Sequence, residues 1–290
     1  MKKLINRIIP LLLAVCVLLC LTACGKKEEP KTFNTISDII LAYENVSDVK
    51  VELLECMKMS KVIDGKNWNM QGGANDGTYG YFAFNDGGSA GQSITRIYKI
   101  NLSNWDVEKI SGDLFLGHAN DVTYVPETHQ LIVTWCETPA ENASIVDADT
   151  LEIVENITYP QKHPNMTYCP ERKHYVFASW VEPRDLTVYD QDLSLAATFP
   201  NSAKQRDHAQ QCLTCDNDLI YFLYSPRASV VDEGYIFIHN WEGKELGKIT
   251  FPLAYEAENI SVYGKGMILA VNDHHEERTI RFYQLTFLEP

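Results

Sequence analysis

Polar residues that can bind a ligand stand just ahead of several β-rich runs of the sequence. His118, Asn120 and Asp121 precede one run, and His163 and Asn165 precede a second, similar run 44 positions later. Imidazole and amide groups can hydrogen-bond the hydroxyls of a sugar, and a carboxylate can accept or release a proton. The same placement recurs along the chain and gives the candidate set Gln71, His118, Asn120, Asp121, His163, Asn165, His208, Gln210 and Glu258.

Three carboxylates, Asp121, Asp207 and Glu258, are the candidates for acid–base chemistry. Hydrolysis of a glycosidic bond requires two carboxyl groups roughly 5 to 9.5 Å apart, one on each side of the bond. The alternative for all these polar residues is structural, because buried polar groups commonly hydrogen-bond neighbouring strands or water. Both interpretations stay open at this point.

Arginines form a second candidate group, because Arg184, Arg227 and Arg278 fall in or beside turn-rich segments of an acidic chain. A planar guanidinium suits a carboxylate or phosphate on a ligand, although surface ion pairs explain the same residues. The run DHHEE at 273–277 is expected to be a solvated loop and no metal site is assigned, since adjacent residues rarely converge on one ion. No cofactor is indicated. No nucleophile with an activating base and no phosphate-binding glycine loop is recognisable.

A unit of β-rich runs and turns occurs five times in the sequence. Two of these units are the most alike, because Thr123, Tyr124, Pro126 and Glu127 of one recur as Thr167, Tyr168, Pro170 and Glu171 of the next. Each unit holds four short β-rich runs separated by turn residues. The strand pairs of the units lie at 71–85 with 94–110, 117–135 with 143–157, 163–180 with 185–199, 207–225 with 234–249, and 258–272 with 278–287.

Units of four antiparallel strands that repeat every 40 to 50 residues or so resemble the blades of a β-propeller. We therefore predict an all-β, five-bladed β-propeller over residues 35–290, with a two-sheet sandwich as the alternative. The fifth unit is one strand short, and the run at 48–63 is expected to supply that strand and close the ring, since an exposed edge promotes aggregation. Residues 35–47 are expected to hold a short helix.

This topology explains the polar positions. In a four-stranded meander, the first strand begins on the face on which the second strand ends. Residues ahead of each inner strand therefore share a surface with the loops at 86–93, 136–142, 181–184, 226–233 and 273–277. We expect the candidate residues to gather around the central channel at that face.

Five-bladed propellers include glycosidases and glutaminyl cyclotransferases. QGG at 71–73 followed by DGTYGYFAF at 76–84 resembles the opening of the cyclotransferase propellers, over the first blade only. The glycosidase families usually place a carboxylate on the first inner strand, where this chain has Gln71, which counts against that activity. Each resemblance implies a fold and does not license a function.

The N-terminus predicts the compartment. A basic start and an apolar run end in LTACG at 21–25, which resembles the lipobox of bacterial lipoproteins. That resemblance implies cleavage after residue 23 and a lipid on Cys24, which holds the protein at the outer side of the cell membrane. Residues 1–23 are then the signal peptide and 24–34 a flexible linker.

Charge and cysteine content limit the partners further. The chain has 25 Lys and Arg against 39 Asp and Glu, a formal net charge of −14, which argues against nucleic acid and against docking on anionic lipid heads. The cysteines of the mature chain, an odd and scattered set, are expected to be free thiols: Cys56, Cys136, Cys169, Cys212 and Cys215. A metal or redox role for CLTC at 212–215 is the alternative.

The sequence thus predicts a lipid-anchored extracytoplasmic propeller that binds a glycan, a cell-wall polymer or a protein partner at its channel face, without catalysis. The alternative is an enzyme at the same mouth. It would be a saccharide hydrolase or lyase that uses Asp121, Asp207 or Glu258, or a cyclotransferase-like enzyme.

Overall fold

The computed structural model describes residues 32–88, 93–136, 142–159, 165–179, 185–201, 208–226, 233–253, 256–273 and 279–290. Residues 34–290 form one compact unit. The predicted signal peptide, the lipobox and Cys24 lie outside the described residues. Among the residues that are described, no helix has the length and apolar character that crossing a membrane requires.

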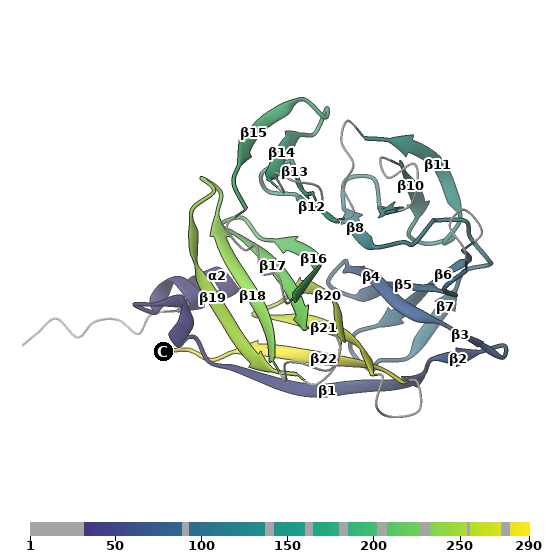
Figure 1. The fold of residues 1–290 in the computed structure, drawn as a ribbon, viewed down its shortest axis with the longest axis horizontal. Helices are drawn as coiled ribbons and strands as arrows, with labels where there is room; N and C mark the ends of the chain where they lie inside the picture. The colour runs from purple at the N-terminus through teal and green to yellow at the C-terminus, as the bar shows by residue number, and fades with distance from the viewer. Residues whose placement is uncertain are drawn as a thin grey trace, which may run out of the picture. The chain divides into compact units, whose positions relative to one another are not determined.

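Five four-stranded antiparallel sheets form a ring, which confirms the predicted five-bladed β-propeller (Figure 1). Blade 1 holds β4 (Asn69–Asn75), β5 (Tyr79–Asn85), β6 (Thr95–Asn101) and β7 (Val107–Ile110). Blade 2 holds β8 (Asp121–Val125), β9 (Gln130–Thr134), β10 (Asn142–Asp147) and β11 (Ile153–Thr158). Blade 3 holds β12 (Asn165–Cys169), β13 (His174–Ala178), β14 (Leu186–Asp190) and β15 (Leu195–Phe199).

Blade 4 holds β16 (His208–Cys215), β17 (Leu219–Pro226), β18 (Glu233–Asn240) and β19 (Glu245–Pro252). Blade 5 holds β20 (Glu256–Tyr263), β21 (Gly266–Asp273), β22 (Thr279–Phe287) and β1 (Val51–Ser60). A small hairpin of β2 (Val62–Ile63) and β3 (Lys66–Asn67) connects β1 to blade 1.

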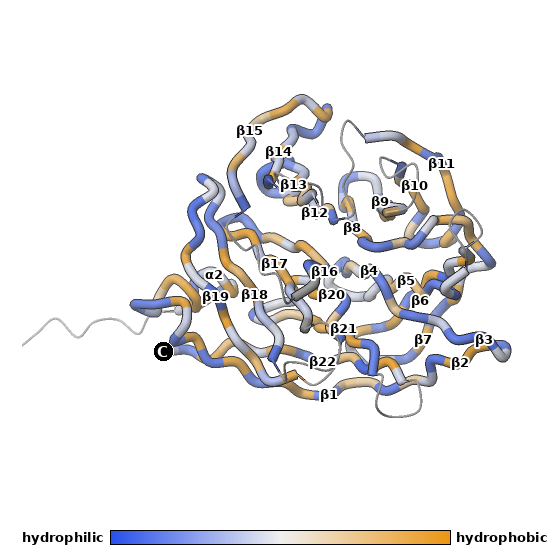
Figure 2. The backbone as a smooth tube through the Cα atoms, viewed as in Figure 1, coloured by the Kyte–Doolittle hydropathy of each residue, from blue (hydrophilic) through white to orange (hydrophobic). Residues whose placement is uncertain are grey.

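The N-terminal strand closes the ring, as predicted. β1 pairs antiparallel with β22, with Val51 opposite Phe287 and Ser60 opposite Thr279. Figure 1 shows this purple strand beside the yellow C-terminal one. Orange and blue alternate along β1 in Figure 2, because only one face of an outermost strand is covered. The closure joins the two ends of the domain and covers the outer edge of β22.

Blade interfaces hold the hydrophobic core, and each cluster of buried side chains spans one seam between blades. At the seam between blades 5 and 1, for example, the rings of Phe82 and Phe282 lie 4.6 Å apart. Burial of a phenylalanine contributes about 1.5 to 3 kcal/mol, so repeated apolar seams can stabilise a ring of small sheets. The blades are thereby fixed relative to one another, and with them the residues that face the channel.

A short helix, α2 (Ile36–Ala42), precedes the ring and has a reciprocal N-terminal cap. Thr35 Oγ1 accepts a hydrogen bond from Asp38 N, and Asp38 Oδ2 accepts one from Thr35 N at 3.0 Å. The backbone N–H groups of Asn34 and Thr35 lower the pKa of Asp38. Ile36, Ile39 and Ile40 are buried, and Ser37 Oγ hydrogen-bonds the carboxylate of Asp216 in blade 4. A 3-10 turn, η1 (Val46–Asp48), follows and leads into β1.

Candidate functional site

The channel has two mouths, which the direction of the inner strands defines. β4, β8, β12, β16 and β20 all begin at one end, here called the upper mouth, and all end at the other, the lower mouth. Gln71, Asn120, Asn165, Gln210 and Glu258 all lie at the upper end of these strands. The structure therefore brings this part of the predicted set together.

β-bulges shape the upper ends of three inner strands. The register shifts between Met70 and Gly73 in β4, between Gln210 and Cys212 in β16, and between Ala257 and Asn259 in β20. The extra residues include Gln71, Gln211 and Glu258. A bulge turns a side chain out of the regular alternation and often lies next to a binding site. The inner strands of blades 2 and 3 pair without such a shift.

An upper belt of polar side chains follows these bulges around the channel: Gln71, Asn120, Asn165, Gln210, Gln211, Glu256, Glu258 and Asn272. At the seam of blades 5 and 1, Asn272 Nδ2 donates to Glu258 Oε1 at 2.7 Å and to Met70 O at 3.0 Å. Met70 N donates back to Asn272 Oδ1 at 3.1 Å. Glu258 is thereby held directly beside the first inner strand.

Amides connect blade 4 to its two neighbours in the same belt. Asn165 Nδ2 donates to Gln211 O at 2.6 Å, and Gln210 Nε2 donates to Asn165 Oδ1 at 2.9 Å. On the other side, Gln211 Nε2 donates to Glu256 Oε1 at 3.4 Å. These contacts fix the positions of the polar groups before any ligand arrives.

Two belt amides are different, because their side chains make no hydrogen bond within the described part of the chain. Gln71 is 7% exposed and Asn120 is 6% exposed. The two lie at the seam of blades 1 and 2, where Gly72 N donates to Ala119 O at 3.2 Å. None of their amide nitrogen or oxygen atoms is among the fully buried polar atoms without a partner in the described residues, so both amide groups reach solvent. Gln71 and Asn120 are thus the belt residues most available to a ligand.

Glu258 lies in the same belt, and burial of its carboxyl group favours the neutral form. Burial, and next the negative charge of Glu256, raise the pKa of Glu258 well above its usual value, against a hydrogen bond from Asn272 and the positive charge of Lys61. A hydrogen bond between the carboxyl groups of Glu256 and Glu258 acts in the same upward direction. A protonated carboxyl group can donate one hydrogen bond and accept others, as a sugar hydroxyl can.

Below the belt, three buried side chains cross the channel axis and form an axial network of Asp121, Cys212 and Asn259. Asp121 Oδ1 lies 3.9 Å from the Cys212 Sγ atom, although the two residues belong to blades 2 and 4. Asn259 Nδ2 donates to Cys212 Sγ at 3.2 Å and to Gly73 O at 2.8 Å. Asp121 Oδ2 accepts from Met166 N at 3.2 Å, so every blade takes part.

Asp121 therefore lies in the interior and holds blades together. Burial raises the pKa of Asp121 well above its usual value, against hydrogen bonds from the backbone of Met166 and Val122. Its two carboxylate oxygens bond the backbone N–H groups of Met166 and Val122. This arrangement matches the structural alternative for Asp121 more closely than a role in acid–base chemistry.

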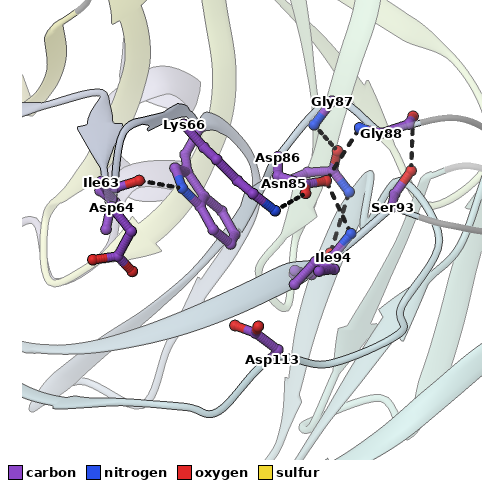
Figure 3. A network of polar contacts seen from close by, with 12 residues as sticks. Ile63, Asp64, Lys66, Asn85, Asp86, Gly87, Gly88, Ser93, Ile94 and Asp113 are labelled. Carbon is purple, nitrogen blue, oxygen red and sulfur yellow. Dashed lines mark hydrogen bonds and ion pairs between the residues drawn. The ribbon is translucent and has the colours of Figure 1, made fainter.

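The base of one upper loop is well defined (Figure 3). Asp86 Oδ2 pairs with Lys66 Nζ at 3.1 Å, and Asp86 Oδ1 accepts from Ile94 N at 3.0 Å and Gly88 N at 3.1 Å. Burial opposes ionisation of Asp86, but the hydrogen bonds from Ile94, Lys66 and Gly88 outweigh it and lower its pKa. The β2–β3 hairpin is thus fastened to blade 1 at the upper mouth.

The remaining predicted site residues are not assigned to the upper belt. His118 is half-buried, and its backbone N–H donates to Trp135 O at 2.7 Å. For His208 only the backbone is described, as the first residue of β16. Outside the described residues lie Asp207, His163, Arg184, Arg227 and Arg278.

The candidate set predicted from the sequence did not include three belt residues, Gln211, Glu256 and Asn272. The segment HAQQCLTC contains two consecutive glutamines, which is one residue more than a regular strand needs at this place. This doubling is the signal that could have indicated the bulge at Gln211. Asn272 ends the second strand of blade 5, and its role depends on contact with Met70, 202 residues away.

The cysteines Cys56, Cys136, Cys169, Cys212 and Cys215 are free, as expected. Cys212 belongs to the axial network, and burial raises its pKa well above the usual value. Within the described residues, no group of three or more His, Cys, Asp or Glu side chains could hold a metal ion.

The lower mouth contains a cavity of about 320 Å³. Residues from all five inner strands line it, one or more positions beyond the axial network. Its walls include the repeated Thr-Tyr pairs, Thr123 with Tyr124 and Thr167 with Tyr168. No residue of this cavity was among the predicted site residues.

No protein-family model matches the chain, and no curated protein matches its sequence. Its fold is similar to a tail fibre of a Staphylococcus aureus phage, with a TM-score of 0.59 and 11% identity over 87% of this chain and 55% of that one. This chain thus spans about half the length of the tail-fibre chain. A member of the duf4221 family from Bacteroides vulgatus gives a TM-score of 0.46 and 11% identity, over 83% of this chain and 99% of that one.

A β-propeller domain from Myceliophteria thermophila gives a TM-score of 0.42 and 11% identity, over 75% of this chain and 84% of that one. At such identities the likeness concerns the fold alone, and propellers serve many functions. The ring of five sheets makes the chain a five-bladed β-propeller, and its function has to be argued from the channel itself.

Proposed function

We propose that this protein binds a polyhydroxylated ligand, a glycan or a segment of cell-wall polymer, at the upper mouth of its channel and does not transform it. The observation that carries the proposal is a pair of amides without hydrogen-bond partners in the described residues, Gln71 and Asn120, in the same belt as Glu258, whose buried carboxyl group has a raised pKa. Amide and carboxyl groups offer donors and acceptors together, which is what neighbouring sugar hydroxyls require. The rest of the upper belt is already hydrogen-bonded and holds these groups in place.

Hydrolysis is the alternative, and the raised pKa of Glu258 is the observation that favours it, since a general acid must be protonated. The second carboxyl group has to be roughly 5 to 9.5 Å away to act as nucleophile or base. Glu256 shares a hydrogen bond with Glu258 and is therefore closer than that, while Asp121 is engaged with backbone N–H groups. Binding without turnover is the better-supported function.

A glycan array tests the proposal, with the chain from residue 26 onward as the probe. Gln71→Ala combined with Asn120→Ala should weaken binding about tenfold or more, because two hydrogen bonds to the ligand are lost. Asn217→Ala, which removes an exposed amide at the lower mouth, is the matched control and should bind normally. An array without any hit, or a double variant that binds as tightly as the parent, contradicts glycan binding and favours a partner protein.

Turnover separates the two functions. For any glycan that binds, the affinity of Glu258→Gln should stay within a few fold of the parent. Neither protein should release a product from that glycan. Release of product by the parent, abolished in Glu258→Gln, would establish the hydrolase.

We further propose that the propeller is held at the outer side of a bacterial cell membrane by a lipid on Cys24. The lipobox LTACG supports this anchor. The helix that follows the predicted linker is held at the lower end of blade 4, where Ser37 hydrogen-bonds Asp216. Mass spectrometry of the membrane-extracted protein should find a diacylglyceryl-modified N-terminal Cys24, and Cys24→Ser should release the protein from the membrane fraction.

A further inference from the structure

The lower cavity carries a ring of hydroxyl groups near the channel axis. Thr123, Thr167, Thr214 and Ser261 occupy equivalent places on four inner strands, and each is at least nine-tenths buried. The repeat that first identified the blades thus also places a hydroxyl group at this end in four of the five blades, and blade 1 has Asn75 in its place. A volume of about 320 Å³ is enough for a small organic ligand.

The hydrogen-bond donors of this cavity are largely used within the protein. Asn75 Nδ2 donates to Ser261 Oγ at 3.0 Å and to Val262 O at 2.8 Å. Thr123 Oγ1 donates to Met166 O at 3.0 Å. Lone pairs on the hydroxyl oxygens remain, so the cavity offers more acceptors than donors.

Thr214 is the exception among the hydroxyl groups, because it is unpartnered. Its side chain lines the cavity and is 7% exposed, and it makes no hydrogen bond in the described part of the chain. A buried hydroxyl group without a partner is costly unless a ligand or water satisfies it. Thr214 is therefore a ready acceptor for a donor group that enters the cavity.

The lining of the cavity is acidic. Asp76, Glu171 and Asp216 are among the lining residues, and the lining contains no Lys, Arg or His. The carboxylates of Asp76 and Asp216 accept hydrogen bonds from their own turns and from tyrosine hydroxyls, which leaves Glu171 as the exposed carboxylate. Arg172 follows the lining residue Glu171 in the sequence but does not line the cavity. Its guanidinium carbon lies over the ring of Trp241, 4.7 Å from the ring centroid. A cation gains from these charges and from desolvation, while an anion is repelled.

Tyrosine rings complete the walls. Tyr124 and Tyr168 line the cavity, and their hydroxyl groups are used elsewhere, Tyr124 with His129 Nδ1 at 2.8 Å and Tyr168 with Glu127 Oε1 at 2.9 Å. Each ring also packs against another, Tyr124 on Tyr81 and Tyr168 on Tyr175, and the parts that line the cavity give it aromatic surface, to which cations are attracted.

We propose that the lower cavity is a binding site for a primary ammonium group, carried by a small aliphatic amine or by the lysine side chain of a partner protein. An ammonium group has three donors, no acceptor and one positive charge. It therefore complements an acceptor-rich, acidic cavity with aromatic walls. The axial network separates this cavity from the upper belt, so the inference stands or falls independently of glycan binding.

Calorimetric titration of the full chain tests this, with putrescine as the free amine and N-acetyl-lysine amide as the mimic of a lysine side chain. Butanediol, which has the same carbon chain as putrescine and no charge, is the ligand control. Both amines should bind saturably and more weakly as salt is added, and butanediol should not bind. Binding of the lysine mimic alone assigns the site to a partner's lysine, whereas binding of putrescine shows that a free amine suffices.

Variants place the binding in the cavity. Thr214→Val, which keeps the size of the side chain, should weaken amine binding about tenfold, as the loss of a hydrogen bond to a charged group does. Glu171→Gln should weaken it about two- to fivefold, since Glu171 is exposed. Glu155→Gln removes an exposed carboxylate on β11 and should change nothing.

Three results would overturn the proposal. One is the failure of both amines to bind saturably at millimolar concentration. Another is binding of butanediol as tight as that of putrescine. The third is an unchanged affinity in Thr214→Val when its melting temperature shows that it is folded.

Discussion

The two mouths of the channel are formed by the same five inner strands, yet they differ in chemistry. The upper mouth carries amides and the carboxyl group of Glu258, whose pKa is raised by burial, at strand ends that three bulges interrupt. The lower mouth carries hydroxyl groups, tyrosines and carboxylates around a cavity, at strand ends with regular pairing. The buried axial network lies between them and prevents either site from extending into the other.

The difference teaches how one repeat can serve two purposes. In a propeller the start and the end of each inner strand face opposite sides, so the His-Asn half of the repeat belongs to one mouth and the Thr-Tyr-Pro-Glu half to the other. Bulges alter the first half without shifting the second, because each extra residue is absorbed locally. The two mouths can therefore change independently in sequence.

Gly72→Ala should have the largest effect, by breaking the seam under the upper belt. A Cβ atom at Gly72 would lie 2.5 Å from Asp121 Cα, a backbone atom that cannot move aside. We expect a loss of about 3 kcal/mol or more of unfolding free energy, measured by urea denaturation. Gly112→Ala, where a Cβ atom meets nothing within 4 Å, is the control. A stable Gly72→Ala variant would mean that blades 1 and 2 are not packed this closely.

Asp121→Ala should come next, because it removes the acceptor of the axial network. The backbone N–H groups of Met166 and Val122 would be left without their partner. A cost of about 2 to 4 kcal/mol in unfolding free energy is expected. Asp121→Asn keeps one acceptor oxygen and should cost less. Equal losses of unfolding free energy in the two variants would show that the axial network depends on the shape of the Asp121 side chain and not on its hydrogen bonds.

Thr123→Val tests the ring of hydroxyl groups in the lower cavity and should lower the unfolding free energy by only about 1 kcal/mol. It removes one neutral hydrogen bond, from Oγ1 to Met166 O, and water in the cavity can satisfy that carbonyl. Thermal or urea unfolding gives the value. A loss of unfolding free energy as large as that of Asp121→Ala would mean that the hydroxyl groups of the lower cavity belong to the tightly packed interior. The lower cavity would then not differ from the axial network in its packing.

Glu258→Gln should have the smallest effect, visible in the pH dependence of stability. The pKa of Glu258 is raised in the folded state above its usual value of 4.5, so the folded protein keeps a proton that the unfolded chain releases. This contribution is complete below the unfolded pKa and is lost as the pH rises through the folded pKa. The parent should therefore lose stability relative to Glu258→Gln above about pH 4.5.

Urea denaturation of both proteins across that range measures the difference. Glu155→Gln, in which an exposed carboxylate is replaced, should show no such trend relative to the parent. Parallel pH profiles for the parent and Glu258→Gln would contradict a protonated carboxyl group at the upper mouth.

The sequence by itself determined the fold. Five units with turn residues at similar places predict five blades, and the missing strand of the fifth unit predicts closure by the N-terminal run. These features depend on short-range alternation and on counting strands, which a single sequence displays directly. The sequence also placed Gln71, Asn120, Asn165, Gln210 and Glu258 at one mouth, because strand direction follows from topology.

Only the tertiary structure decided what those residues do. Asp121 and Gln71 look equivalent in the sequence, as polar residues near the start of inner strands. In the structure, Asp121 bonds the backbone of the next blade and approaches Cys212 of blade 4, whereas Gln71 has no partner in the described residues. The lower cavity was also beyond prediction, because its volume depends on how five strands approach one axis. Such contacts join residues tens to hundreds of positions apart, and their distances are set by the packing of whole blades.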